Sequence, residues 1–195
     1  MEQLQLLKMT QSSEQSIIDQ VKYQQLSWAC PCRGWDVEML LNKMITSALL
    51  FSTLCRGEIP EPDVNLLFPE NVGGADASIT FEAASIDCFA AFEDSVLEEE
   101  EMMGPLWEII PKSVGLLVRS LDATINTWDL AQAIDVDPEI AAEQALELIS
   151  FAEEFLPKVR TQTDHVRFAP ARNPTNTTDP LEKLVLLSGR NLNWF

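Results

Sequence analysis

Residues 112–134 read KSVGLLVRSLDATINTWDLAQAI, and this stretch decides the fold. Its apolar residues recur at spacings of three and four, which places them on one face of an α-helix. The members of this face are Val114, Leu117, Val118, Leu121, Ile125 and Trp128. The pattern predicts a long amphipathic helix from about Lys112 to Ile134, whose apolar face must pack against other helices.

The N-terminal third of the chain predicts two more long helices. The first ten residues are polar and are expected to be loose, and a helical pattern then runs over residues 11–28. Residues 29–34 contain Pro and Gly and break that pattern. Asp36 is a good N-cap for the second helix, which ends before Gly57.

A third helix is expected between the second helix and residue 112. Residues 57–76 are rich in Pro, Gly and Asn and predict a surface loop, and a helical pattern then covers about 79–97. The acidic run 98–101 is expected in a turn or loop, because the C-terminal end of a helix favours cations. Four long amphipathic helices favour an all-α fold, an antiparallel four-helix bundle.

The C-terminal part predicts shorter additions to the bundle. Asp137-Pro138 has the cap-then-proline order that starts a helix, and Pro157 is expected to close it. Asp179-Pro180 has the same order and predicts a last short helix that ends at Gly189.

The length of 195 residues fits one domain with a sizeable core. We expect a single domain over 1–195, with the bundle at about 11–135 and the C-terminal helices and tail at about 136–195. Hydrophobic residues make up 46% of the chain, which is ordinary for a globular protein.

The formal net charge of −18 bears most directly on partners. An acidic surface repels phosphate backbones and anionic lipid headgroups, so neither nucleic acid nor a membrane is expected as a partner. The charge is expected mainly to keep a monomer or homodimer in solution, with a small molecule as the substrate.

The cysteines and the N-terminus indicate a cytoplasmic protein. Cys30 and Cys32 are separated by one residue, which matches neither a zinc ribbon nor a thioredoxin motif. The N-terminus lacks the basic and apolar regions of a signal peptide, and no stretch approaches the ~20 apolar residues that span a bilayer. The sequon at Asn176 is therefore expected to be accidental.

Three segments resemble a known family. Residues 30–37, CPCRGWDV, look like the "PCxGWxV" segment before the second helix of the DinB-like, mycothiol-dependent maleylpyruvate isomerase superfamily. Residues 126–131, NTWDLA, are similar to its "HxWDLA" signature, and residues 181–194 resemble the C-terminal "RLxxxxGRxPxW" of an actinobacterial branch. The order and separation of the segments fit the family over nearly the whole chain.

The resemblance implies a metal site, and this chain departs from it at the ligands. In the family, a histidine of the second helix joins a carboxylate and a histidine of the fourth to activate a low-molecular-weight thiol. The matching positions here are Lys43, Asp122 and Asn126. An ammonium has no lone pair and an amide is a weak zinc ligand, so we expect no metal and no cofactor. His165, alone of its kind, is expected in an exposed segment.

By carry-over from the family, Lys43, Asp122 and Asn126 are the candidate catalytic residues, and Trp35, Met39 and Trp128 are candidates for the substrate pocket. A partly desolvated lysine facing a carboxylate could replace the charge of the metal and stabilise an oxyanion. The alternative is a structural salt bridge in an inert site.

The neighbouring residues also have structural alternatives. Trp35 and Trp128 could be core aromatics, and Cys32 is more commonly a buried, inert thiol. Arg190 is expected to pair with a carboxylate of the bundle in a structural role.

Three functions remain open. The first is a metal-independent small-molecule enzyme that catalyses an isomerisation, cyclisation or similar tailoring step in specialised metabolism, since a shaped cavity can act by orientation. The second is a small-molecule binding protein without catalysis. The third is a metal- and mycothiol-dependent isomerase or S-transferase.

Overall fold

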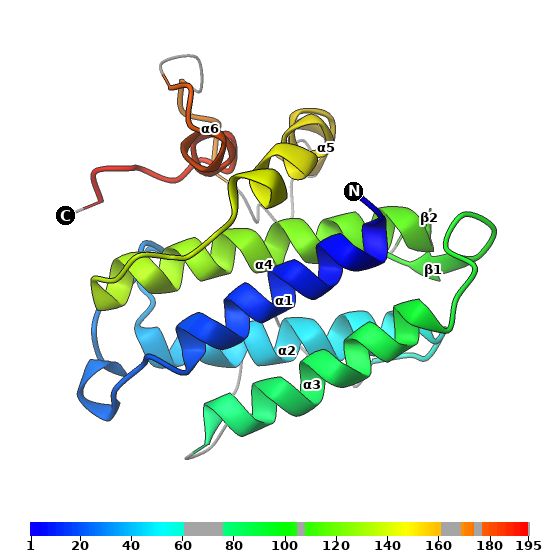
Figure 1. Cartoon of the computed structure of the whole chain (residues 1–195), viewed down its shortest axis with the longest axis horizontal. Coiled ribbons are helices and arrows are strands. Elements are labelled where there is room, and N and C mark those ends of the chain that lie inside the picture. Colours follow the sequence, from blue (N-terminus) through cyan, green and yellow to red (C-terminus); the bar gives the residue numbers. More distant parts are fainter. Residues whose placement is uncertain (61–75, 105–107, 161–168, 174–176, 195) are drawn as a thin grey trace.

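A computed structural model gives the architecture and describes residues 1–60, 76–104, 108–160, 169–173 and 177–194. Four long helices form a bundle: α1 (Gln3–Ile18), α2 (Val37–Cys55), α3 (Ala77–Glu93) and α4 (Lys112–Ile134) (Figure 1). Around the bundle the order is α1, α4, α2, α3, so that each helix packs on two others. This arrangement confirms the predicted all-α four-helix bundle.

Side-chain contacts between the helices fix their directions. Gln15 Nε2 donates to Ser78 Oγ (3.0 Å) and Gln11 Nε2 to the carbonyl of Ser85 (3.1 Å), so α1 and α3 run antiparallel. The pair α2 and α4 is also antiparallel, while α1 runs in the direction of α4 and α2 in that of α3 (Figure 1). The candidate site residues lie on the antiparallel pair of α2 and α4.

Local sequence explains where α2 and α4 begin and end. Asp36 caps α2 as expected, because its Oδ1 accepts a hydrogen bond from the backbone N–H of Met39 (2.9 Å). Helix α4 has the predicted bounds, and Asp135 ends it in the left-handed region with φ 58°.

The expected position of the first helix was wrong. Helix α1 begins at Gln3, within the residues expected to be loose, and ends at Ile18 instead of continuing to residue 28. Leu6 and Leu7, within the residues expected to be loose, are buried on its inner face together with the polar Thr10, Gln11 and Glu14. Tyr23–Gln25 form a 3-10 turn.

The segment between α3 and α4 also differs from expectation. Helix α3 ends at Glu93, and a short antiparallel hairpin follows, in which β1 (Glu101–Met103) pairs with β2 (Ile109–Pro111). The central pair of the register is Met102 opposite Ile110. Residues 98 and 99 lie in a turn and residue 100 in a loop, as expected, but residue 101 opens β1.

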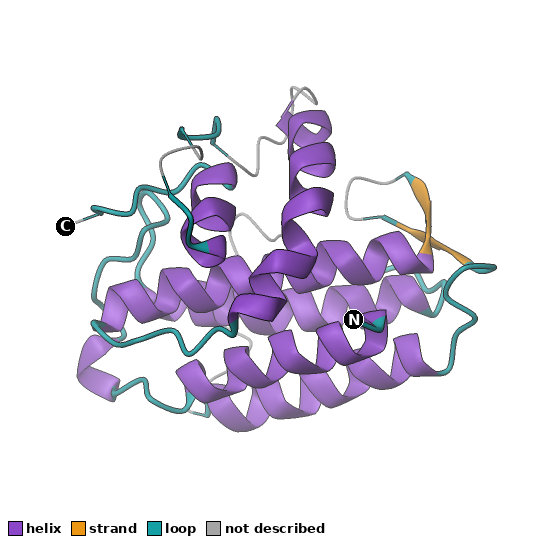
Figure 2. Ribbon diagram, turned by 45° about the horizontal axis from the view of Figure 1, so that its top comes forward, coloured by secondary structure: helices purple, strands orange, loops and turns teal. Residues whose placement is uncertain are grey.

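The C-terminal helices stand on one side of the bundle and cross its helices steeply (Figure 2). Helix α5 (Ala142–Arg160) begins later than expected, because Asp137 Oδ1 accepts from the N–H of Glu139 (3.1 Å) in a local turn where Glu139 has φ 46°. Pro157 lies inside α5 and does not close it. Helix α6 (Pro180–Leu187) is capped by Asp179 as expected.

Two hydrophobic clusters result. One fills the bundle, and the other joins α4 to α5 and α6 through residues such as Leu121, Ile125, Leu148 and Leu184. Contrary to the sequence-based expectation, α2 is long and apolar enough to cross a membrane by length and composition. Within the described residues α2 alone passes this test, and 72% of the tested stretch is buried inside the protein. Such burial is typical of a helix in the core of a bundle.

Candidate functional site

The structure brings Lys43, Asp122 and Asn126 together between α2 and α4. Lys43 Nζ donates to Asp122 Oδ1 in a short ion pair and to Asn126 Oδ1 at 2.7 Å. Asp122 and Asn126 are four residues apart on α4, so they lie on one face of the helix. The Lys43 side chain is 13% exposed and that of Asp122 is 21% exposed, so solvent reaches the pair only partly.

Ser47 completes the cluster. It lies four residues after Lys43 on α2, and its Oγ donates to Asp122 Oδ2 at 2.8 Å. Asn126 Nδ2 donates to the same oxygen at 3.1 Å. Ser47 was missed in the sequence, although its spacing from Lys43 was a usable signal. The result is a carboxylate with both oxygens hydrogen-bonded.

These contacts decide the charge of Asp122. Burial alone would raise the pKa of this carboxyl, but the Lys43 ammonium, the Arg119 guanidinium and the hydrogen bonds from Lys43 and Ser47 outweigh burial and lower the pKa to about 2. Asp122 is therefore ionised at neutral pH and fixes the position of the lysine.

The residues present do not fit a transition metal. The cluster offers one carboxylate whose oxygens already bind Lys43, Ser47 and Asn126, together with an ammonium that has no lone pair. Among the described residues, no three His, Cys, Asp or Glu side chains are grouped closely enough to hold an ion. His165 lies outside the described residues.

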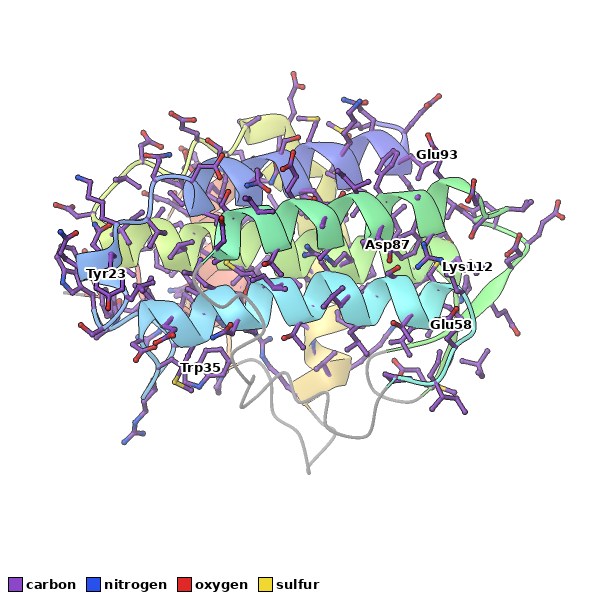
Figure 3. All side chains as sticks on the ribbon, turned by 90° about the horizontal axis from the view of Figure 1, so that it is seen from below. Tyr23, Trp35, Glu58, Asp87, Glu93 and Lys112 are labelled. Carbon is purple, nitrogen blue, oxygen red and sulfur yellow. The ribbon has the colours of Figure 1, made fainter. Side chains whose placement is uncertain are left out.

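Of the three candidate pocket residues, Trp35 and Trp128 pack in different hydrophobic clusters. Met39 is half-buried and lies four residues before Lys43, on the same face of α2. Trp35 is half-buried and packs against the bundle core at the end of α2 opposite Lys112 and Glu58 (Figure 3). Trp128 lies about 120° around α4 from Asp122 at 100° per residue, and is buried in the cluster with α5 and α6. Of the three candidate pocket residues, Met39 is the one that shares a face of α2 with Lys43.

A second charged cluster ties the C-terminal segment to α4. Arg190 Nη2 donates to Asp129 Oδ2 (2.7 Å), and the Cys32 thiol donates to the same oxygen (3.4 Å). The pairing of Arg190 with a bundle carboxylate agrees with expectation. The pKa of the Cys32 thiol is raised by its hydrogen bond with Cys30, by burial and by the Asp129 carboxylate. This thiol is therefore a poor nucleophile.

A third charged pair, Glu14 and Arg119, was also missed in the sequence. Arg119 Nη2 donates to Glu14 Oε2 at 2.5 Å, and neither side chain is exposed to solvent. The partner of Arg119 depends on how α1 packs on α4. The spacing of residues along one helix does not show this packing.

A cavity of about 340 Å³ lies at the hairpin end of the bundle, away from Lys43. Its lining comes from the end of α2 and the hairpin: Leu54, Gly57, Glu58, Ile59, Pro60, Glu101, Met102, Met103 and Ile109. The sequence-predicted site residues do not contribute to this cavity.

The chain was similar to no family model and to no curated protein. It is similar to the crystal structure of a histidine-to-alanine mutant of the mycothiol-dependent maleylpyruvate isomerase, with a TM-score of 0.60. The two proteins share a fold. The similarity covers 78% of this chain and 68% of the other, at 17% sequence identity.

The similarity confirms the fold that the sequence resemblance implied. At 17% identity it shows the fold alone, because one fold hosts many activities. The chemistry of this chain depends on its own residues.

Proposed function

We propose that the protein is a metal-independent enzyme that acts on a small organic molecule in an isomerisation, cyclisation or similar tailoring step. The observation that carries this proposal is the fixed, partly desolvated Lys43 ammonium between α2 and α4. By the carry-over from the sequence resemblance, Lys43, Asp122 and Asn126 match the metal-ligand positions of relatives. Lys43 would supply a positive charge there in place of the metal.

The geometry of Lys43 suits the stabilisation of an oxyanion. An ammonium has three N–H bonds, and the described contacts use two of them, to Asp122 and Asn126. The third can donate to a carbonyl or enolate oxygen of a substrate. Because Asp122 and Asn126 hold the ammonium in place, little reorganisation is needed when charge develops on that oxygen.

A binding protein without catalysis is the second candidate. The observation in its favour is that both oxygens of Asp122 accept hydrogen bonds and its pKa is lowered to about 2, so this carboxylate is a weak general base near neutral pH. In this case Lys43 would hold a ligand oxygen without turnover.

The test uses the methyl group of Met39 as an NMR probe next to Lys43, with the Met103 methyl in the hairpin as the remote control. Small keto acids, beginning with maleylpyruvate, are added to protein treated with a chelator, and both methyl shifts and turnover are followed. An enzyme gives a Met39 shift and a product. Lys43→Met should then lower turnover roughly 10²–10³-fold, the scale of losing one oxyanion donor.

The other outcomes are distinct. A Met39 shift without product identifies a binding protein. The third outcome is turnover that appears only when a divalent metal and a thiol are added and that survives Lys43→Met. It would contradict the proposed function and support a metal- and thiol-dependent enzyme.

A further inference from the structure

The cavity at the hairpin end of the bundle combines apolar walls with two negative charges. Its volume of about 340 Å³ lies within the range of small-molecule sites. Among the described residues that line it, Glu58 and Glu101 are the only ones with a charged side chain, and the others are glycine, proline and large apolar residues. A ligand in this cavity therefore meets apolar surface and two carboxylates.

The hairpin wall of the cavity is held in place by its contacts with α4. Met102 is 3% exposed, and its sulfur occupies the position that a side chain at Gly115 would need. Lys112, the first residue of α4, donates from its Nζ to Glu100 Oε2 at 2.7 Å and from its backbone N–H to the Glu100 carbonyl at 2.9 Å. This wall is therefore formed without a ligand, which lowers the cost of ordering it on binding.

The two carboxylates come from different elements and have no cation bound to them. Glu58 follows the end of α2 (Figure 3), and Glu101 opens β1. Within the described part of the chain, neither side chain forms a hydrogen bond or an ion pair. Arg56 interacts electrostatically with Glu58, yet both of its Nη atoms donate to Asp87. Because an ionised carboxylate accepts hydrogen bonds and cannot donate them, the cavity favours ligand groups that are cationic donors.

Apolar surface at the same cavity is left open to solvent. Ile59 is 92% exposed and Ile109 is 59% exposed, and both line the cavity. Exposed apolar surface that is rimmed by polar residues is typical of a binding site. The cavity also contains Met102 and Met103, and methionine side chains adapt to ligands of irregular shape and make favourable contacts with aromatic rings. These walls suit a ligand with an apolar or aromatic body.

We propose that this cavity binds a small organic amine, whose apolar body packs against the isoleucines and methionines and whose ammonium lies against Glu58 and Glu101. The two carboxylates would repel an anion, and a neutral molecule would gain only the apolar contacts. The site is separate from Lys43, so the proposal does not rest on the proposed function. The two sites would select ligands of opposite charge.

The experiment measures the binding of phenethylamine to the full-length protein, with phenethyl alcohol and phenylpropionate as neutral and anionic counterparts. The methyl resonances of Met103 in the cavity and of Met39 beside Lys43 are followed by NMR. We expect the amine to shift the Met103 resonance and not that of Met39. It should bind about tenfold more tightly than the alcohol, the scale of two partly exposed ion pairs. Phenylpropionate should not shift Met103.

Two double variants separate the cavity from the general attraction of an acidic protein for cations. Glu58→Gln with Glu101→Gln keeps the shape of the cavity, removes both charges and should abolish the preference for the amine over the alcohol. Glu82→Gln with Glu93→Gln makes the same change in net charge at exposed positions of α3 and should retain that preference.

Three results would each overturn the proposal: equal binding of the amine and the alcohol, an equal loss of amine binding in the two double variants, or no shift of Met103 at millimolar amine. None of these results bears on the proposed function, because that test reads Met39 with keto acids. An inert Lys43→Met would in turn leave amine binding at the hairpin end unaffected.

Discussion

At the scale of single residues, Asp122 determines how the site responds to acid. Its pKa is lowered from 3.8 to about 2 in the folded protein, so folding favours the ionised form. Such a group stabilises the fold above the unfolded pKa, and the stabilisation is lost as the pH falls toward the folded pKa. The shift corresponds to on the order of 2 kcal/mol.

This gives a prediction for the free energy of unfolding between about pH 4 and pH 2, measured with urea. Asp122→Asn should be less stable than the wild type near neutral pH, and the difference should shrink as the pH falls through this window. Asp94→Asn, at an exposed carboxylate outside the cluster, serves as the control. A gap between wild type and Asp122→Asn that stays constant down to acid pH would contradict the assignment.

Arg190 gives a second test at this scale. Asp129 is completely buried and Arg190 neutralises it, so Arg190→Met would leave a buried charge without its counterion. Removing one partner of such a pair costs about 3–5 kcal/mol. The matched control is Lys183→Met, because Lys183 pairs with Glu153 at a more exposed site, where the loss should stay below about 1 kcal/mol. Chemical denaturation of both variants compares them directly, and equal losses would show that Asp129 finds another partner.

The residues of the candidate site could be predicted only in part. The spacing of Asp122 and Asn126 put them on one face of a helix, and the family resemblance suggested that Lys43 would meet them. Glu14 and Arg119 could not be found in this way, because a contact between α1 and α4 depends on the rotation and offset of two helices. Single-helix periodicity carries no information on either quantity.

At the scale of secondary-structure elements, the sequence predicted a helix correctly where its apolar pattern was uninterrupted. Helix α4 has an uninterrupted apolar stripe and followed its predicted bounds. Helix α1 was misplaced because the first ten residues were expected to be loose, although Leu6 and Leu7 among them are buried in the protein. Gln11 and Glu14 lie inside the predicted helix and are buried polar residues that bond to α3 and α4.

Asp36 provides the prediction at this scale. Its carboxylate accepts from the N–H of Met39 at the start of α2, so Asp36→Ala should destabilise the protein by about 1 kcal/mol. Asp36→Asn keeps a side-chain oxygen at the cap and should lose only a small part of that stability. Thermal or urea unfolding compares the two variants. If Asp36→Ala and Asp36→Asn are equally stable, the cap does not contribute as described.

At the scale of the whole molecule, one hydrophobic cluster fills the bundle and a second joins α4 to α5 and α6. The fold agrees with that of the isomerase structure even though 17% of aligned residues are identical. Packing of apolar faces tolerates such divergence, because it needs hydrophobic volume more than particular side chains. A metal site does not tolerate sequence divergence at its ligands, because each ligand must keep its donor atom.

The last prediction follows from that difference and concerns bound metal. Lys43 Nζ lies between Asp122 and Asn126, so a cation at this position would meet an ammonium and a carboxylate whose oxygens are already hydrogen-bonded. We therefore expect protein purified without an affinity tag to contain far less than one equivalent of zinc or nickel by elemental analysis. A strong chelator should leave its melting temperature unchanged, because no ion contributes to the folded state.

Lys43→His makes this test sharper. It returns a neutral imidazole to the α2 position and leaves Asp122 and Asn126 in place, so the donor set gains a nitrogen that can bind zinc. Added zinc should raise the melting temperature of Lys43→His and not that of the wild type. Stoichiometric metal in the wild-type protein, with a melting temperature that drops on chelation, would contradict the replacement of the metal by Lys43.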